Sequence, residues 1–193
     1  MTTPVTEQLP GGLAFATPAD WFPLRVPRER ADADVLTGQL LAARPGLPRE
    51  AVARMARGLV DACAELDILC AYTTALTVPG GPLPATVIAS AHPASGLDVE
   101  QIAQRMAGGS LPVCFDLPAG RTARIERLQE QPVPGRDDRV VSLIVQYVTQ
   151  IPGTDDVVVL TFSTPALGLG RELQQLFHQM ACTLRFEPAG RPR

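Results

Sequence analysis

The chain has 193 residues, of which 46% are apolar and 19% are charged, and its formal net charge is −3. A chain of this length buries about 70% of the surface that it exposes when unfolded, so we expect a globular protein that needs neither disulfides nor a structural metal. The small negative charge argues against general binding to nucleic acid or to anionic membranes, which requires a basic face.

Two residue types are absent from the sequence. All 17 basic residues are arginine, and the chain contains neither lysine nor asparagine, a bias that is typical of GC-rich coding. A Schiff-base lysine, a P-loop lysine and an asparagine-based oxyanion hole or metal ligand are therefore excluded.

The four cysteines lie among apolar neighbours, and none forms a CxxC pair: Cys63, Cys70, Cys114 and Cys182. We expect reduced thiols that pack as small hydrophobic side chains. The sequence has no apolar run of 18 residues, and its first residues resemble neither a secretion signal nor a lipidation site. We therefore expect a soluble cytoplasmic protein.

The N-terminal segment is polar at first and then becomes extended. Residues 1–12 contain two prolines and a Gly-Gly pair, which predicts a disordered tail. Residues 12–27 predict a short strand, a turn at residues 18–20 and a second extended piece. Each piece is short enough that we expect only edge strands.

Residues 32–67 predict a helical insertion of two helices. The first, over residues 32–43, places apolar and neutral side chains at helical spacing: Val35, Leu36, Gln39, Leu40 and Ala43. The segment at residues 44–46 ends it, and Pro48 begins the second helix at a first-turn position. The second helix carries one apolar stripe: Val52, Met55, Leu59, Val60, Cys63 and Leu66.

From residue 68 the pattern changes to strands. Residues 68–78 and 85–91 are apolar runs on either side of a Pro-Gly-Gly-Pro turn, which predicts a hairpin. Asp98 then begins a short helix, with Gln101 as its capping-box partner, and Gly108-Gly109 ends it.

Four further strands are predicted as a meander, over residues 111–118, 121–129, 139–152 and 157–164, with a turn at residues 152–156. The strand at residues 157–164 is apolar on both faces, so both of its faces must be covered. The last helix, within residues 170–186, has one stripe that faces the core: Leu173, Leu176, Phe177, Met180, Ala181 and Leu184.

Together these elements predict an α+β fold, in which an antiparallel β-sheet is flanked by helices on both faces as an α/β/α sandwich. We expect one domain over residues 13–187, with the helical insertion at residues 32–67 and a disordered tail at residues 188–193.

The order of the elements resembles a known superfamily. Phe15, Pro18, Trp21 and Leu24 form an F-x-x-P-x-x-W-x-x-L pattern, and the late strand pair ends in TFSTP before a terminal helix that closes on FHQMACTLRF. These features resemble the Mog1/PsbP-like superfamily, including the actinobacterial LpqN-type proteins, over residues 12–27 and 68–186. The resemblance implies an α/β/α sandwich and a mostly non-catalytic role, such as binding a small GTPase or serving a photosystem or cell-envelope complex.

The sequence departs from this superfamily at two points. It has the additional helical pair at residues 32–67, and it lacks the export or lipidation signal of the envelope members. The resemblance therefore implies neither a particular partner nor a set of functional residues.

Candidate catalytic and metal-binding residues are few. His92 and Ser95 are close in sequence, but no GxSxG motif accompanies them, so we interpret the segment as a polar turn before Asp98. His178 and Cys182 are four residues apart, a spacing that is able to bind zinc. The residue one helical turn before His178 is Gln174, and the sequence offers no further ligands for a zinc ion. We therefore interpret His178 as a residue at the boundary between the core and the surface.

The remaining motifs have structural explanations. Asp137-Asp138 and Asp155-Asp156 are expected in hairpin turns, where aspartate bonds to its own backbone. The glycine-rich segments at residues 79–82 and 168–170 lack the spacing and the lysine of a phosphate loop. Trp21-Phe22 is interpreted as a core anchor of the N-terminal segment rather than a binding anchor.

We therefore predict a non-enzymatic adaptor or accessory protein of an actinobacterial protein complex, with a protein partner and no cofactor, metal or catalytic residue. The resemblance to the envelope members implies that this complex is linked to secretion. One alternative is a small-ligand binder or an unrecognised hydrolase, with a pocket between the sheet and residues 32–67. Another is a structural subunit of a larger assembly, in which the chain is a homo-oligomer.

Overall fold

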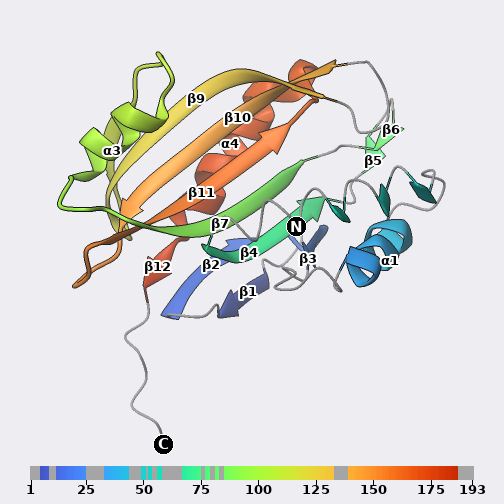
Figure 1. Ribbon diagram of the computed structural model, residues 1–193, viewed down its shortest axis with the longest axis horizontal. Coiled ribbons are helices and arrows are strands. Elements are labelled where there is room, and N and C mark those ends of the chain that lie inside the picture. The colour runs from blue at the N-terminus through green and yellow to red at the C-terminus, as the bar shows by residue number, and fades with distance from the viewer. Residues whose placement is uncertain are drawn as a thin grey trace, which may run out of the picture.

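A seven-stranded antiparallel sheet forms the centre of the computed structural model (Figure 1). The strand order is β3-β4-β7-β11-β10-β9-β8. In this order the strands are β3 (Trp21–Leu24), β4 (Asp67–Thr74), β7 (Thr86–Pro93), β11 (Asp156–Thr164), β10 (Arg139–Gln150), β9 (Gly120–Pro132) and β8 (Val113–Leu117). The structure describes residues 5–8, 12–24, 33–43, 49–50, 52–53, 56–57, 67–74, 77–78, 81–82, 85–132 and 139–186.

The predicted meander and hairpin are both present in this sheet. β8, β9, β10 and β11 follow one another with antiparallel pairing, and β4 pairs with β7 as the hairpin pattern predicted. A two-residue pair, β5 (Thr77–Val78) with β6 (Gly81–Pro82), extends the β4–β7 connection. β11 also pairs with β7, so the hairpin and the meander form one continuous sheet.

A second, three-stranded sheet joins the two ends of the chain. It has the order β1-β2-β12, with β1 (Val5–Gln8), β2 (Leu13–Thr17) and β12 (Arg185–Phe186). The expected tail at residues 1–12 thus contains a paired strand. The prediction that both N-terminal pieces are edges is correct for β3 but wrong for β2, because β2 has a partner on each side. The predicted domain boundary at residue 187 and the tail beyond it lie outside the described residues.

One face of the large sheet, which we call the α4 face, packs against the terminal helix α4 (Gly170–Cys182). In Figure 1 this helix runs behind β10 and β11. The predicted stripe of α4 is buried, apart from the half-buried Leu176, while Glu172, Gln175 and Gln179 are exposed. Phe177 is fully buried and stacks on Phe162 of β11 with their ring centroids 4.7 Å apart.

The opposite face, the α3 face, is covered in part by the short helix α3 (Val99–Met106). Val99, Ile102 and Ala103 pack there against Val157 and Val159 of β11. Both bonds of the predicted capping box are formed: the Gln101 amide N–H donates to Asp98 at 2.8 Å, and the Asp98 amide N–H donates to Gln101 at 3.2 Å.

Strand β11 is buried on both faces, as its sequence predicted. Val158, Leu160 and Phe162 belong to the core under α4, whereas Val157 and Val159 belong to the core under α3. Because this strand lies at the centre of the sheet order, a helix layer covers each of its faces. The predicted α+β sandwich is therefore confirmed.

The helical insertion is described only in part. Helix α1 (Ala33–Ala43) buries Leu36 and Leu40 against Val52 and Ala56, which lie in helical segments further along the chain. Val35, which the sequence placed at helical spacing with Leu36 and Leu40, is 47% exposed. Most of the second stripe, including Met55 and Cys63, lies outside the described residues. Within the described part of the chain, each helix is too short or too polar to cross a bilayer.

Candidate functional site

His92 and Ser95 do not form a catalytic pair. The His92 Nε2 atom shares a 2.8 Å hydrogen bond with the hydroxyl of Ser90, two residues earlier on β7. Ser95 is exposed and has a φ of 54°, a left-handed conformation that is typical of turns. The structure therefore shows His92 bonded to a residue of its own strand, and it places Ser95 in the polar turn that the sequence predicted.

Asp155 lies in the β10–β11 turn, as predicted, and Asp156 is the first residue of β11. The Asp155 carboxylate accepts from the Gly96 amide, 3.3 Å from each oxygen, and the Asp155 carbonyl accepts from Ala94 at 2.8 Å. Its carboxylate thus joins two neighbouring turns rather than bonding only within its own. Asp137 and Asp138 lie outside the described residues.

Trp21 is part of the core, as the sequence analysis favoured. Its side chain is 4% exposed and its ring meets Phe177 edge-on, with centroids 6.4 Å apart. The Trp21 Nε1 atom is buried and makes no hydrogen bond within the described residues. Gly168 and Leu169 belong to a 3-10 turn (Leu167–Leu169) that leads directly into α4.

His178 and Cys182 come together on the side of α4 that meets β8 and β10. The Cys182 Sγ atom and the His178 Nε2 atom share a 3.6 Å hydrogen bond across one helical turn. The His178 ring packs against Phe115 of β8, at 5.6 Å between centroids, and against Tyr147 of β10, at 6.1 Å. Among the described residues, no three His, Cys, Asp or Glu side chains gather in a way that could hold a metal ion.

Polar side chains surround this pair on the α4 face. Arg124 Nε lies 3.0 Å from Glu126 Oε1 on β9, and Gln174 of α4 donates to Glu126 Oε2 at 3.0 Å. Three buried polar atoms lie in this cluster: Arg124 Nε pairs with the Glu126 carboxylate, Tyr147 Oη lies beside the Arg124 guanidinium, and His178 Nδ1 makes no hydrogen bond within the described residues. Most buried polar groups in proteins have a hydrogen-bond partner, so the His178 Nδ1 atom is unusual. We call these six residues the flank cluster: Arg124, Glu126, Tyr147, Gln174, His178 and Cys182.

Burial raises the pKa of Tyr147 to about 12, because the charged phenolate would lose its hydration. The neighbouring Arg124 guanidinium opposes this rise, whereas Glu126 and Cys182 add to it. The hydroxyl is therefore neutral at physiological pH.

This pKa predicts a loss of stability at alkaline pH. Tyrosine in an unfolded chain ionises near pH 10, so between pH 10 and about 12 the unfolded chain releases the proton before the folded protein does. The stabilisation is complete below pH 10 and falls by about 3 kcal/mol as the pH rises through 12. Urea denaturation across this range measures it, and no lysine titrates in the same interval.

Tyr147→Phe is the matched variant, because it removes the ionisable hydroxyl and keeps the buried ring. We expect its free energy of unfolding to vary less between pH 10 and 12 than that of the wild type. Equal slopes for the two proteins would contradict the assignment.

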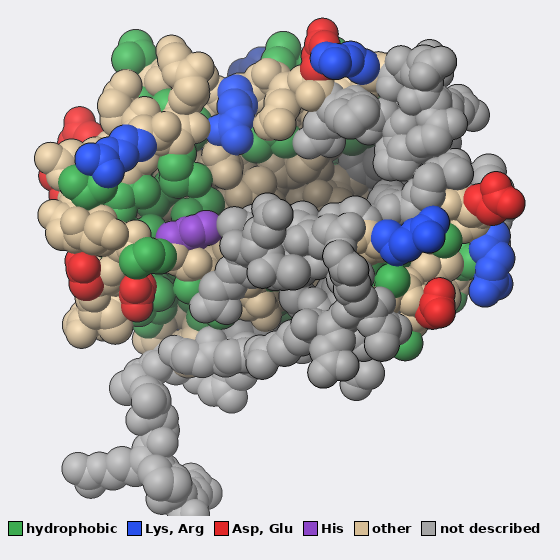
Figure 2. Space-filling view, in the orientation of Figure 1, with side chains coloured by type: hydrophobic (Ala, Val, Ile, Leu, Met, Phe, Trp, Pro, Cys, Tyr) green, Lys and Arg blue, Asp and Glu red, His purple; other side chains and the backbone are tan. Residues whose placement is uncertain are grey.

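The α3 face is polar where α3 does not cover it. One cross-strand row consists of Thr73, Thr86, Ser163, Ile144 and Arg127. Arg127 donates to Gln146 at 2.7 Å and to the Met106 carbonyl at 3.3 Å, which ties the end of α3 to the sheet. Gln146 in turn donates to Thr161 at 3.1 Å. Figure 2 shows this face hollowed at its middle, with a floor that is mainly polar or backbone.

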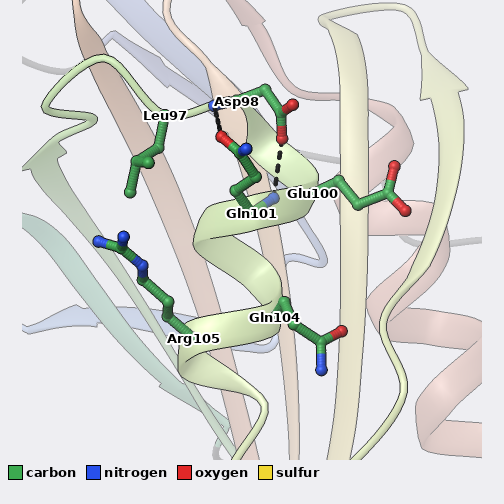
Figure 3. A pocket seen from close by; sticks show the side chains of 6 residues that line it. All are labelled: Leu97, Asp98, Glu100, Gln101, Gln104 and Arg105. Carbon is green, nitrogen blue, oxygen red and sulfur yellow. Dashed lines mark hydrogen bonds between the residues drawn. The ribbon is translucent and has the colours of Figure 1, made fainter.

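A separate depression lies on α3 itself (Figure 3). It is shallow and open, has a volume of about 520 Å³, and is lined only by α3 and the turn before it: Leu97, Asp98, Glu100, Gln101, Gln104 and Arg105. Asp98 and Gln101 already serve the capping box, which leaves Glu100, Gln104 and Arg105 as the other polar side chains of this surface. It is not the predicted pocket between the sheet and residues 32–67.

Exposed apolar side chains gather on the α4 face, along the β8–β10 side of the sheet. Leu128 is 64% exposed and pairs across β9 and β10 with Leu143, whose Cδ2 lies 3.8 Å from the position that a Cβ on Gly170 of α4 would take. Alternation along the strands places Val113 and Val141 on the same face, and the exposed Leu167 directly precedes α4. We call Val113, Leu128, Val141 and Leu167 the apolar flank.

The fold defines the class of protein: an α+β sandwich in which an antiparallel sheet lies between helices. The structure is similar to the Ran-binding protein Mog1p of Saccharomyces cerevisiae, with a TM-score of 0.51 and 10% identity over 96% of each chain. It is also similar to a Mog1 point mutant, with a TM-score of 0.52 and 10% identity over 97% of this chain and 98% of that one.

The chain has the Mog1/PsbP-like fold, as the sequence resemblance implied. The cyanobacterial PsbP of Synechocystis sp. PCC 6803 has a TM-score of 0.47 and 11% identity over 97% of this chain and 94% of that one. No family model and no curated protein matches the sequence. At 10% identity the likeness to Mog1 shows the fold alone.

The sequence analysis did not identify the flank cluster. The sequence analysis considered His178 and Cys182 together, but Tyr147 lies on β10, and Arg124 and Glu126 lie on β9. Only the pairing of β9 with β10, which sets Arg124 opposite Tyr147, brings the charged pair to the helix flank.

Proposed function

We propose that this protein is a non-enzymatic adaptor or accessory protein that binds another protein. One observation carries the proposal: the fold extends over 96% of both this chain and a protein described as Ran-binding, Mog1p. The apolar flank supports it, because groups of exposed apolar side chains are characteristic of protein interaction sites.

We also propose the kind of complex and the cellular location in which the protein acts. The resemblance to LpqN-type proteins favours an actinobacterial complex, including one linked to secretion, and the sequence favours a cytoplasmic location. The partner's identity is left to experiment, since the structural likeness is to a protein only 10% identical.

Affinity purification with mass spectrometry tests this proposal. We expect the tagged wild-type protein to recover a stoichiometric protein partner from native lysate, and Leu128→Arg to reduce that recovery about 30-fold, the effect of losing an apolar contact at the centre of an interface. Val35→Arg is the matched control, because Val35 is also exposed but lies on α1.

Failure to recover a partner, with a monomeric protein in light scattering, would overturn the adaptor proposal. A discrete homo-oligomer that Leu128→Arg dissociates would instead support the structural-subunit alternative.

The hollow on the α3 face favours the second candidate, a small-ligand binder or hydrolase (Figure 2). The α3 face carries half-buried hydroxyls at Thr86, Thr161 and Ser163. Mass spectrometry of the purified protein under native and denaturing conditions tests this candidate. A small molecule released only on denaturation would support it.

A further inference from the structure

The described cysteines differ in their surroundings. Cys70 is buried, and burial, with Glu100 as the next cause, raises the pKa of the half-buried Cys114. Cys182 is also half-buried, but its sulfur lies 3.6 Å from the His178 Nε2 atom. A thiol beside an imidazole has a base at hand to accept its proton, which is the arrangement that activates cysteine nucleophiles.

The packing around His178 determines which nitrogen of its ring faces the Cys182 thiol. The Phe115 and Tyr147 rings lie against the imidazole, and its Nδ1 atom is buried without a hydrogen bond. The imidazole nitrogen that meets the thiol is therefore Nε2, and the ring is held in place by two aromatic neighbours.

A second, independent observation lies beside the pair. The Tyr147 side chain is 1% exposed, and its hydroxyl lies beside the Arg124 guanidinium and close to Cys182. Because arginine can only donate hydrogen bonds, the Tyr147 O–H is able to donate to an incoming polar group or to a sulfur that gains negative charge.

We propose that Cys182 and His178 form a site for mixed-disulfide formation with a small-molecule disulfide. The Cys182 thiol gives its proton to His178 Nε2 as its sulfur attacks one sulfur of the small disulfide. The S–S bond of the reagent breaks as the new S–S bond forms, and the departing thiolate takes up the proton. Cys182 is oxidised, half of the small disulfide is reduced to a thiol, and no other reactant is required.

Cys182 is half-buried at the C-terminal end of α4, so part of its side chain is exposed. Along the helix the neighbouring Gln179 and Thr183 are exposed, and the polar and charged groups around the pair are Arg124 and Glu126 of β9 and Tyr147 of β10. Arg124 and Glu126 pair with each other, so the surroundings carry no strong net charge that would repel a small disulfide of either sign.

The probes are 5,5′-dithiobis(2-nitrobenzoate) and oxidised glutathione, with the modified cysteine identified by peptide mass spectrometry. At pH 7 an ordinary thiol is roughly 3% ionised, so activation by a base raises its rate by at most about 30-fold. We expect Cys182 to react about tenfold faster than Cys114, and Cys182→Ser to remove this fast reaction.

Two substitutions of the base separate chemistry from packing. His178→Phe keeps an aromatic ring against Phe115 and Tyr147, and His178→Gln keeps a polar side chain; both are expected to slow modification of Cys182 about tenfold at pH 7. We expect the pH dependence of the Cys182 rate to differ between the wild type and both variants. Gln179→Ala is the control on the same helix.

Cys114 provides the internal standard, since its rate should be the same in every variant that remains folded. The proposal is overturned if Cys182 reacts no faster than Cys114, or if its rate and pH profile are unchanged by both His178 substitutions. A rise in the modification rates of all cysteines together would show that the variant has unfolded. In that case the ratio of the Cys182 rate to the Cys114 rate in the folded His178→Phe protein shows whether His178 activates Cys182.

Discussion

Phe177→Ala is expected to destabilise the protein by about 3–5 kcal/mol, because it removes the central aromatic ring of the α4 core. Phe177 is fully buried, stacks on Phe162 at 4.7 Å and meets the Trp21 ring at 6.4 Å. Its loss would leave a cavity between α4, β11 and β3. Urea denaturation at neutral pH, followed by tryptophan fluorescence, measures the effect, and Trp21 is the chain's only tryptophan.

Gln175→Ala is the matched control, because Gln175 lies on the exposed side of the same helix. Its effect should stay within about 0.5 kcal/mol, as is usual for surface substitutions. A loss below 1 kcal/mol for Phe177→Ala would show that α4 does not close the core in this way.

Val158→Asp and Val159→Asp are each expected to cost more than about 4 kcal/mol, enough to unfold a protein of ordinary stability. The two residues are neighbours on β11 but point to opposite faces, one to the core under α4 and the other to the core under α3. Both are at most 1% exposed, so each carboxylate would be buried without a partner. Circular dichroism and thermal denaturation measure the loss.

Val141→Asp is the control for this pair, because it is the same substitution on the neighbouring strand β10 at a side chain that is 36% exposed. We expect a folded protein. If Val159→Asp were tolerated as well, the α3 layer would not cover the sheet, and the two-sided sandwich would be wrong.

The sequence was most informative where the residue pattern of a single helix or strand is sufficient to predict which of its side chains are buried. The stripe from Leu173 to Leu184 and the two apolar faces of residues 157–164 identify the buried surfaces, because burial of apolar side chains depends on local periodicity. The capping box at Asp98 and Gln101 was likewise predictable, since both of its hydrogen bonds join residues three positions apart.

Pairing between distant segments was not predictable in the same way. β2 was expected at an edge, but it lies between β1 and β12, and β12 comes from the far end of the chain. Register decides such contacts, and a strand's own sequence shows which face is apolar without showing which strand lies beside it.

The sequence by itself thus determined the class of fold, an antiparallel sheet covered by helices, because that class follows from which faces are apolar. The tertiary structure alone decided the strand order and the flank cluster, where Arg124 and Tyr147 from paired strands meet His178 and Cys182 of α4. The physical reason is that the pattern of apolar side chains within one helix or strand shows which of its faces is buried. Contacts between polar groups of different elements depend on how those elements pack together.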